Sequence, residues 1–329
     1  MILGGMAHRI RWAIPYIHRR KVLHMLLPKA LERGDTIGII APASPPDRKR
    51  LEAAISFFTD LGLKVKLGKN INKVYGYLAG NDDERLDDFH QMVADDGIKA
   101  IVFACGGYGT ARIASRLDYE LIKQHSKIIW GYSDITYLHT AIRQKTGLVT
   151  FHGPMLSSDI ADSDFDPLSA ASFQQLFKPT ILQYNETISN LEVLVEGKAT
   201  GELVGGNLTL LISTLGTEFE IQTKGKVLLL EDIDEQPYRI DSMLNQLTLT
   251  GKLEEAAGVI IGPFTNAEPK KKPSLSLEII LRHYLENLSI PVLSGFKIGH
   301  CNPHFGVPLG VEATIDSQAK TLSIMPGVN

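Results

Sequence analysis

Between Thr36 and Thr150 the chain alternates short apolar stretches with amphipathic stretches of helical period. Strands separated by helices of this length favour parallel pairing, because a parallel connection needs a crossover of a dozen or more residues. Right-handed crossovers place helices on both faces and predict an open three-layer, flavodoxin-like α/β domain that binds ligands at the carboxyl ends of its strands. The expected strands are 36–41, 63–67, 100–104, 127–130 and 148–151, and the expected helices are 48–60, 82–95, 110–124 and 135–146.

A chain of 329 residues exceeds what one hydrophobic core usually organises, so we expect two domains. We place an α/β nucleophile domain at 25–165, a linker at 166–190 and a mixed β/α domain at 191–329. The stretch 157–189 is rich in Asp and Ser around one short helix, which is typical of a connection. Beyond it we expect two strands within 191–204, a Gly-led helix at 205–215, strands at 226–231 and 257–262, a helix at 276–288 and then short strands.

The first 24 residues differ from the rest, with five basic residues, three histidines and no acid. Arg9 and Arg11 interrupt the apolar core that a signal peptide needs, and no span approaches the ~20 apolar residues that cross a bilayer. We expect a basic extension outside the fold, with Met25 as a possible true start. A basic helix on a membrane surface is the alternative.

The overall composition fits an ordinary cytoplasmic enzyme. A net charge of −3, without clustered Lys and Arg, argues against nucleic-acid binding. Cys105 and Cys301 are too few for a disulfide framework and lack the paired spacing of a zinc site. We therefore expect no metal and no cofactor, in a reducing compartment.

A single serine, Ser133, stands where an apolar strand at 128–130 gives way to a helix. Gly131 permits a tight turn, and the free N–H groups of the starting helix stabilise negative charge. The arrangement is similar to a nucleophile elbow, although Ile135 stands where the G-x-S-x-G pattern has its second glycine. Taken alone, the position also suits a serine that only caps the helix.

Two further polar residues follow apolar strands far downstream. Glu231 comes directly after the strand expected at 227–230, and His300 follows a glycine in the Gly- and Pro-rich stretch 290–311. Each alone also suits a bland interpretation, a solvated carboxylate or a loop histidine. Together with Ser133 they supply the nucleophile, orienting group and base that activate a hydroxyl at neutral pH.

The glycine turn 106–109 follows the strand expected at 100–104. It has neither the lysine of a Walker loop nor the spacing of a dinucleotide fingerprint. Close approach of its backbone to a reacting carbonyl is the better interpretation.

Eight ordered blocks, covering nearly the whole chain, resemble the LD-carboxypeptidase family (serine peptidase family S66, muramoyltetrapeptide carboxypeptidase-like), which uses a Ser-Glu-His triad. The blocks are LPKALERGDTIGIIAPASPP, YLAGNDDERLDDFHQM, GGYGTARI, LDYELIKQHSKIIWGYSDITYLHTAI, TGLVTFHGPM, GGNLTLLISTLGT, LLLEDIDEQPYRID and the GH and PLGV pair.

The resemblance assigns the site residue by residue. The family nucleophile falls on Ser133 in GYSD, the glutamate on Glu231 and the histidine on His300. The backbone N–H groups of Asp134 and Gly107 are the expected oxyanion donors. The resemblance further implies a C-terminal swivelling β/β/α domain, no cofactor and a homodimer.

The chain departs from the family pattern in three places. Cys105 and Ser242 replace arginines, which leaves open what holds a carboxylate of the substrate, and the loop after His300 is CNPHFG. We prefer His300 as the base over His304, which suits a surface histidine or a substrate contact. Cys301 suits a small packing residue rather than a nucleophile.

By resemblance, the substrate is a murein tetrapeptide or muropeptide, from which the enzyme releases terminal D-alanine during peptidoglycan recycling. One alternative is the microcin-immunity branch, which cleaves peptidyl or aminoacyl nucleotides. That branch tends to carry Asn-Ser-Asn where this chain has Gly109 to Arg112. A second alternative is a peptide-binding protein without catalysis, which the intact set of Ser133, Glu231 and His300 disfavours.

Overall fold

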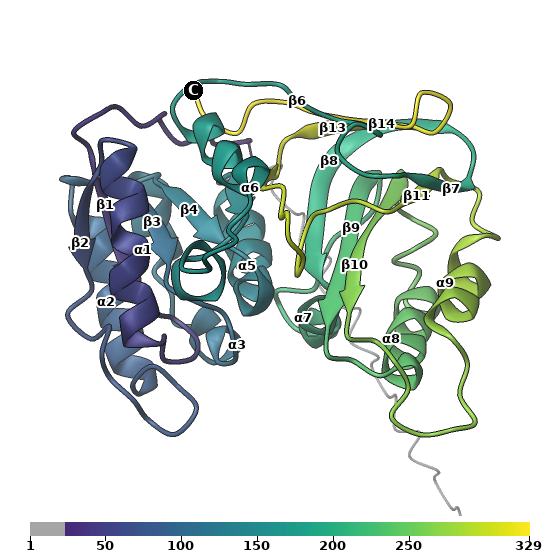
Figure 1. Cartoon of the computed structure of the whole chain (residues 1–329), viewed down its shortest axis with the longest axis horizontal. Helices are drawn as coiled ribbons and strands as arrows, with labels where there is room; N and C mark the ends of the chain where they lie inside the picture. The colour runs from purple at the N-terminus through teal and green to yellow at the C-terminus, as the bar shows by residue number, and fades with distance from the viewer. Residues whose placement is uncertain (1–23) are drawn as a thin grey trace, which may run out of the picture.

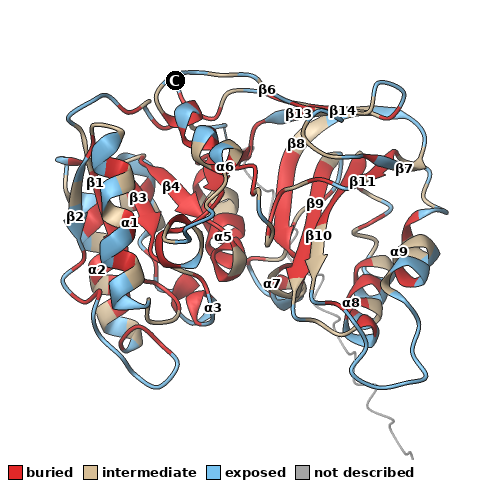
Figure 2. Cartoon of the chain, in the orientation of Figure 1, coloured by how far each residue is buried: buried red, intermediate tan, exposed pale blue. Residues whose placement is uncertain are grey.

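The computed structural model describes residues 24–329, so the basic extension expected at 1–24 lies, except for His24, outside the described residues. Within these residues two β-sheets lie side by side, each with its own helices (Figure 1). The central strands of both sheets are buried, while the outer faces of the helices are exposed (Figure 2). The predicted fold class, a parallel-sheet α/β domain followed by a second β/α domain, is confirmed.

The first sheet has six strands, of which the five from the N-terminal half are parallel, as the alternating pattern predicts. Because these five strands run in the same direction, their carboxyl ends lie at one edge of the sheet. In sheet order the strands are β12 (Val307–Leu309), β5 (Thr150–His152), β4 (Ile128–Gly131), β3 (Ile98–Phe103), β1 (Thr36–Ile40) and β2 (Lys64–Leu67).

Helices cover both faces of the first sheet. One face packs against α1, whose buried residues are Leu51, Ala54 and Phe58, and the other packs against the remaining helices. Asn81 and Glu84 form a capping box that fixes the start of α2. The helices are α1 (Arg48–Asp60), α2 (Asp82–Ala94), α3 (Thr110–Ala114), α4 (Tyr119–Gln124) and α5 (Thr136–Thr146).

The second sheet has eight strands, with a parallel centre of β8, β9, β10 and β11 and antiparallel strands at its edges. Its helices, α7 (Leu208–Thr214), α8 (Pro237–Leu249) and α9 (Leu277–Leu285), pack on one face. In sheet order the strands are β6 (Leu182–Tyr184), β14 (Thr321–Ile324), β13 (Glu312–Asp316), β8 (Lys198–Asn207), β9 (Lys226–Ile233), β10 (Gly258–Thr265), β11 (Val292–Ser294) and β7 (Glu192–Val195).

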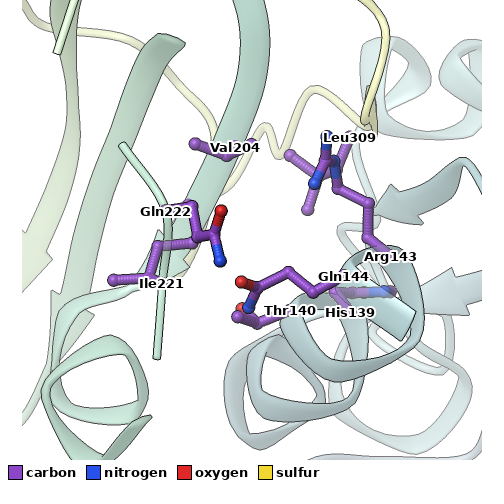
Figure 3. A pocket seen from close by; sticks show the side chains of 9 residues that line it. His139, Thr140, Arg143, Gln144, Val204, Ile221, Gln222 and Leu309 are labelled. Carbon is purple, nitrogen blue, oxygen red and sulfur yellow. The ribbon is translucent and has the colours of Figure 1, made fainter. Parts of the chain in front are cut away.

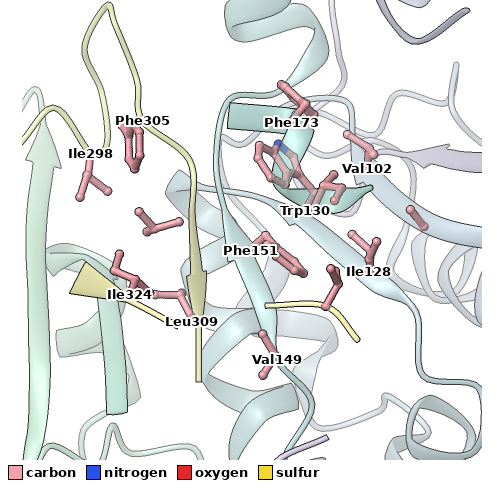
Figure 4. Packing of buried hydrophobic residues seen from close by; sticks show 14 of the residues in the cluster. Val102, Ile128, Trp130, Val149, Phe151, Phe173, Ile298, Phe305, Leu309 and Ile324 are labelled. Atoms are coloured by element: carbon pink, nitrogen blue, oxygen red, sulfur yellow. The ribbon is translucent and has the colours of Figure 1, made fainter. Parts of the chain in front are cut away.

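One apolar cluster joins the two sheets. It runs from Trp130 and Phe151 of the first sheet through Leu309 of β12 to Ile324 of the second (Figure 4). Strand β12 comes late in the chain yet pairs antiparallel with β5 in the first sheet. The chain therefore crosses back between the sheets and carries the segment after His300 to the edge of β5.

Three elements differ from the sequence-based expectation. The helix expected at 110–124 is divided, because Asp118 caps a new helix by accepting a hydrogen bond from the Leu121 N–H. The helix expected at 205–215 begins only at Leu208, because Gly205 and Gly206 extend β8.

The third difference is the connecting segment. It holds a π-helical turn η2 (Leu156–Ile160), α6 (Pro167–Ala171), a 3-10 helix η3 (Ser172–Leu176) and strand β6, rather than one short helix. Phe173 is buried against Trp130, with the ring centroids 4.3 Å apart. Because the segment is mostly polar, its sequence does not indicate that residues such as Phe173 belong to the core.

Candidate active site

Ser133 lies at the carboxyl end of β4, at the start of a 3-10 turn η1 (Ser133–Ile135) that leads into α5. Its φ angle is 64°, a left-handed conformation that costs a non-glycine residue about 1–3 kcal/mol. Gly106 makes room for the turn, since a Cβ there would lie 2.9 Å from the Ser133 Cβ. The sequence therefore folds into a strained strand-to-helix elbow that presents the hydroxyl, as the elbow comparison anticipates.

Ser133, His300 and Glu231 form one hydrogen-bonded chain. The Ser133 Oγ lies 3.0 Å from His300 Nε2, and His300 Nδ1 lies 2.6 Å from Glu231 Oε2. The His300 backbone N–H also donates to Oε2, at 3.3 Å. A carboxylate at Nδ1 favours the tautomer with its proton on Nδ1, which leaves Nε2 free to accept the serine proton.

Glu231 lies in β9 and is fully buried, with 0% of its surface exposed. Its other oxygen, Oε1, has no hydrogen-bond partner among the described residues. Within this part of the chain, the carboxylate therefore accepts hydrogen bonds from His300 alone. Two glycines make the space, because a Cβ at Gly299 would lie 2.5 Å from Oε2 and one at Gly262 would lie 3.0 Å from the Glu231 Cβ. A larger residue at either position would displace the carboxylate.

The pKa of His300 results from opposing effects. Burial lowers it, but the charge and hydrogen bond of Glu231, followed by the charges of Asp159 and Asp232, together raise it more, so the pKa lies above its ordinary value. The arrangement thus stabilises the protonated imidazole that forms when a base accepts a proton.

The two expected oxyanion donors lie on the turns beside Ser133. The Asp134 carboxylate accepts a hydrogen bond from the Thr110 N–H at 2.9 Å, which ties the serine turn to the start of α3. The glycine turn is fixed by Ser44, whose N–H donates to Gly106 O at 3.2 Å and whose Oγ accepts from the Tyr108 N–H. Gly107 has φ 109° and a Cβ there would lie 2.2 Å from Ser44 Oγ, so this position needs glycine.

A cavity of ≈430 Å³ opens over Ser133 and His300. Its wall includes Ser133, His300, Gly107, Cys105 and Arg50. A second hollow, between α5 and β8, encloses only ≈10 Å³, about the space of one water molecule (Figure 3). Of these two spaces, only the first has room for a substrate, and Ser133 lies in its wall.

The side chains near His300 that were weighed as alternatives differ from it in the structure. His304 is only 2% exposed, so the interpretation as a surface histidine is wrong, and burial lowers its pKa to about 3. Neither of its ring nitrogens has a partner among the described residues, and its ring packs against Tyr132. Cys301 donates to Pro303 O, and burial raises its pKa to about 12, so it remains a thiol.

Sequence reasoning missed two residues of this region. The Tyr132 hydroxyl donates to Asp159 Oδ1 at 2.8 Å, and the Tyr132 ring packs against His300. Burial raises the pKa of Asp159 to about 6. Asp159 gave no signal because it lies in the polar segment that we interpreted as a connection.

Within the part of the chain that the structure describes, no three His, Cys, Asp or Glu side chains group so as to hold a metal ion. None of the helices in residues 24–329 is long and apolar enough to cross a membrane.

Comparison with known proteins places this geometry in a family. The N-terminal domain of the LD-carboxypeptidases matches residues 37–153, and their C-terminal domain matches residues 200–315. The chain belongs to the LD-carboxypeptidase family. It is 58% identical to a "Probable murein peptide carboxypeptidase" of Bacillus subtilis, over 92% of this chain and 95% of that protein.

Solved structures of LD-carboxypeptidase relatives share the whole fold. A "muramoyltetrapeptide carboxypeptidase from Oxalobacter formigenes" superposes with a TM-score of 0.80 at 28% identity, covering 89% of this chain and 100% of that one. The microcin C7 self-immunity protein MccF of Escherichia coli is 30% identical, over 91% of this chain and 96% of that protein. MccF in complex with glutamyl sulfamoyl guanosine superposes with a TM-score of 0.83, covering 91% of this chain and 98% of that one.

The structure shows where Cys105 and Ser242, the two residues that stand in place of arginines of the family pattern, lie. Cys105 lines the cavity and donates to Ser44 O at 3.2 Å, and burial raises its pKa to about 12. Ser242 lies in α8 and does not belong to the cavity wall. Of the two positions, only Cys105 therefore lies in the wall of this cavity.

Proposed function

We propose that the chain is a serine carboxypeptidase that hydrolyses the L,D-peptide bond of murein tetrapeptides and releases terminal D-alanine. The observation that carries the proposal is the hydrogen-bonded chain from the Ser133 hydroxyl through His300 to the buried Glu231. The names of the Bacillus subtilis and Oxalobacter formigenes relatives support the substrate class. Cell-wall recycling in the cytoplasm, by a homodimer, is part of the same proposal.

In the proposed mechanism, His300 accepts the Ser133 proton as the hydroxyl oxygen attacks the scissile carbonyl. His300 then returns the proton to the departing amine of D-alanine, and water hydrolyses the acyl-enzyme with His300 again as base. Glu231 stabilises the imidazolium that forms at each of these steps. Its burial strengthens this effect, because water does not screen the pair.

The oxyanion of the tetrahedral intermediate is assigned to the backbone N–H groups of Asp134 and Gly107. Helix α5 follows the Asp134 turn, so that N–H lies at the positive end of a helix. Loss of a single oxyanion donor typically costs about 3 kcal/mol of transition-state stabilisation. A side chain at Gly107 would displace Ser44 and with it the backbone N–H of the turn. Substitution of Gly107 therefore tests the oxyanion role more directly than substitution of Asp134.

A second candidate is hydrolysis of a peptidyl or aminoacyl nucleotide, favoured by the TM-score of 0.83 to MccF with glutamyl sulfamoyl guanosine. The turn after Tyr108 argues against it. Gly109 has φ 132°, and a Cβ there would lie 2.6 Å from Leu78 Cδ2 and 2.7 Å from Arg85 Nη1. An asparagine at this position, as the microcin-immunity branch tends to carry, requires a different turn.

The proposal is tested with the purified chain and L-Ala-γ-D-Glu-meso-diaminopimelate-D-Ala, with released D-alanine detected by mass spectrometry. We expect turnover by the wild type and none above background by Ser133→Ala, because the variant lacks the nucleophile. Thermal unfolding of the variant should stay close to that of the wild type, since the substitution removes one hydroxyl at the edge of a cavity. Turnover of a peptidyl-adenylate analogue in place of the peptide would favour the second candidate.

A further inference from the structure

Apart from the titratable His300, one cationic side chain among the described residues lines the cavity over the triad. Arg50, in the first turns of α1, is the only Lys or Arg in the cavity wall as residues 24–329 form it. The other charged residue of the wall is Asp47, whose carboxylate is engaged as the N-cap of α1 and accepts from the Arg50 backbone N–H at 2.9 Å. The cavity thus presents a positive group to whatever occupies it.

The Arg50 guanidinium is held along one edge only. Its Nε donates to Ser157 O at 2.5 Å, and its Nη2 donates to Asp162 Oδ1 at 2.6 Å and to Ser158 O at 3.3 Å. No described residue accepts a hydrogen bond from Nη1, which carries two N–H groups. The side chain is therefore oriented by the protein and keeps two donors for a ligand.

We propose that Arg50 binds the terminal carboxylate of the substrate and so makes the enzyme selective for a free carboxyl end. This inference rests on the proposed function, because a carboxypeptidase that removes one residue places that carboxylate one residue from the scissile bond. Arginine matches a carboxylate with charge-assisted, directional hydrogen bonds. Asp162 shares the positive charge, and its bond to Nη2 leaves the Nη1 end for the substrate.

This assignment also accounts for the loss of an arginine at Cys105. The Cys105 thiol turns to Ser44 O on the cavity wall and brings no charge. Arg50 supplies a cation to the same cavity from helix α1. Its neighbour Ser157 is held in place, because the Ser157 N–H and Oγ both donate to Ala104 O. The carboxylate-binding role thus does not require a basic residue at position 105.

The test compares two peptides that differ only at their end, L-Ala-γ-D-Glu-meso-diaminopimelate-D-Ala and the same peptide ending in D-alaninamide. The variants are Arg50→Gln, Arg50→Lys and the control Arg48→Gln. Arg48 lies on the same helix, is exposed and pairs with Glu52, outside the cavity. For each enzyme kcat/KM is measured on both peptides, together with the thermal unfolding temperature.

We expect the wild type to prefer the free carboxylate. Arg50→Gln should lower kcat/KM for the free acid by about 10- to 100-fold, the usual loss for a charge-assisted hydrogen bond, and leave the amide peptide unchanged. Arg50→Lys should fall between, since it keeps the charge without the planar fork. Arg48→Gln should behave as the wild type on both peptides.

Equal losses on both peptides, or no loss on the free acid, would overturn the role of Arg50, because binding of the terminal carboxylate must change their ratio. The ratio is measured within one variant, so a partly unfolded Arg50→Gln sample lowers both rates equally and does not imitate the expected result. If the wild type cleaves neither peptide, the proposed function fails and this inference fails with it. If the wild type cleaves both equally, only the inference about Arg50 fails.

Discussion

At the scale of single residues, the site depends on side chains that are absent as much as on those present. Gly106, Gly262 and Gly299 each lie where a Cβ would meet Ser133 or Glu231 within 3.0 Å. The backbone of these glycines therefore packs directly against Ser133 and Glu231 and restricts how their side chains can turn. Ser133 in turn holds a left-handed conformation that a serine adopts only when its surroundings impose it.

The raised pKa of His300 predicts a pH dependence. The base must be neutral to accept the Ser133 proton, so kcat/KM should fall as the pH drops through the pKa of His300. In Glu231→Gln the charge that raises this pKa is lost, so the acid limb should move to lower pH, and the plateau should fall by about 10²-fold. Rate profiles across the acid and neutral pH range for both enzymes check this, and an acid limb that stays in place would contradict it.

The buried position of His304 predicts a different outcome for its removal. His304→Ala should leave kcat close to that of the wild type, because the Ser133 hydrogen bond is made by His300. The cavity it leaves beside Tyr132 should lower the free energy of unfolding by about 2 kcal/mol. Denaturant unfolding and steady-state rates separate the two effects. If His304→Ala were inactive but as stable as the wild type, His304 rather than His300 would be the base.

At the scale of elements, the sequence predicts what lies in strongly periodic segments. The five parallel strands and the helix after Ser133 appear within a few residues of their expected bounds, because the buried strands are continuously apolar and the helix has a clear helical period. The strand that continues through Gly205 and Gly206 was missed, since glycine pairs are typical of turns. The pairing of β12 with the edge of β5 could not be predicted from local sequence either, because the two strands lie far apart in the chain.

The same glycine pair carries a prediction. A Cβ at Gly205 would lie 2.1 Å from Leu229 O, two residues before Glu231 on the neighbouring strand, and its φ is 118°. Gly205→Ala should therefore lower the free energy of unfolding by about 2 kcal/mol or more and reduce kcat by displacing β9.

The matched control for this variant is Gly216→Ala. Gly216 has φ 75°, but a Cβ there would have no atom within 4 Å, so only backbone strain of about 1 kcal/mol applies, with kcat unchanged. Thermal unfolding and kcat of the two variants are compared with the wild type. Equal effects would show that β8 tolerates a side chain at Gly205.

At the scale of the whole molecule, the three residues proposed as catalytic come from both sheets. Ser133 follows a strand of the first sheet, Glu231 lies in the second, and His300 precedes the crossing segment that ends in β12. Helix α5 contacts β8, so the serine turn rests against the second sheet. The site is complete only when the two halves are packed together.

This arrangement predicts that the two halves unfold as one. Two-domain chains of this size often show separate transitions, but here one apolar cluster crosses from Trp130 to Ile324, and β12 pairs with the first sheet. Calorimetry should show a single transition. Leu309→Ala in β12 and Leu244→Ala in α8, both buried, should each remove about 2–5 kcal/mol and lower the temperature of that same transition. Two resolved transitions, each moved by only one of the variants, would show instead that the halves are independent and that the triad is assembled by docking.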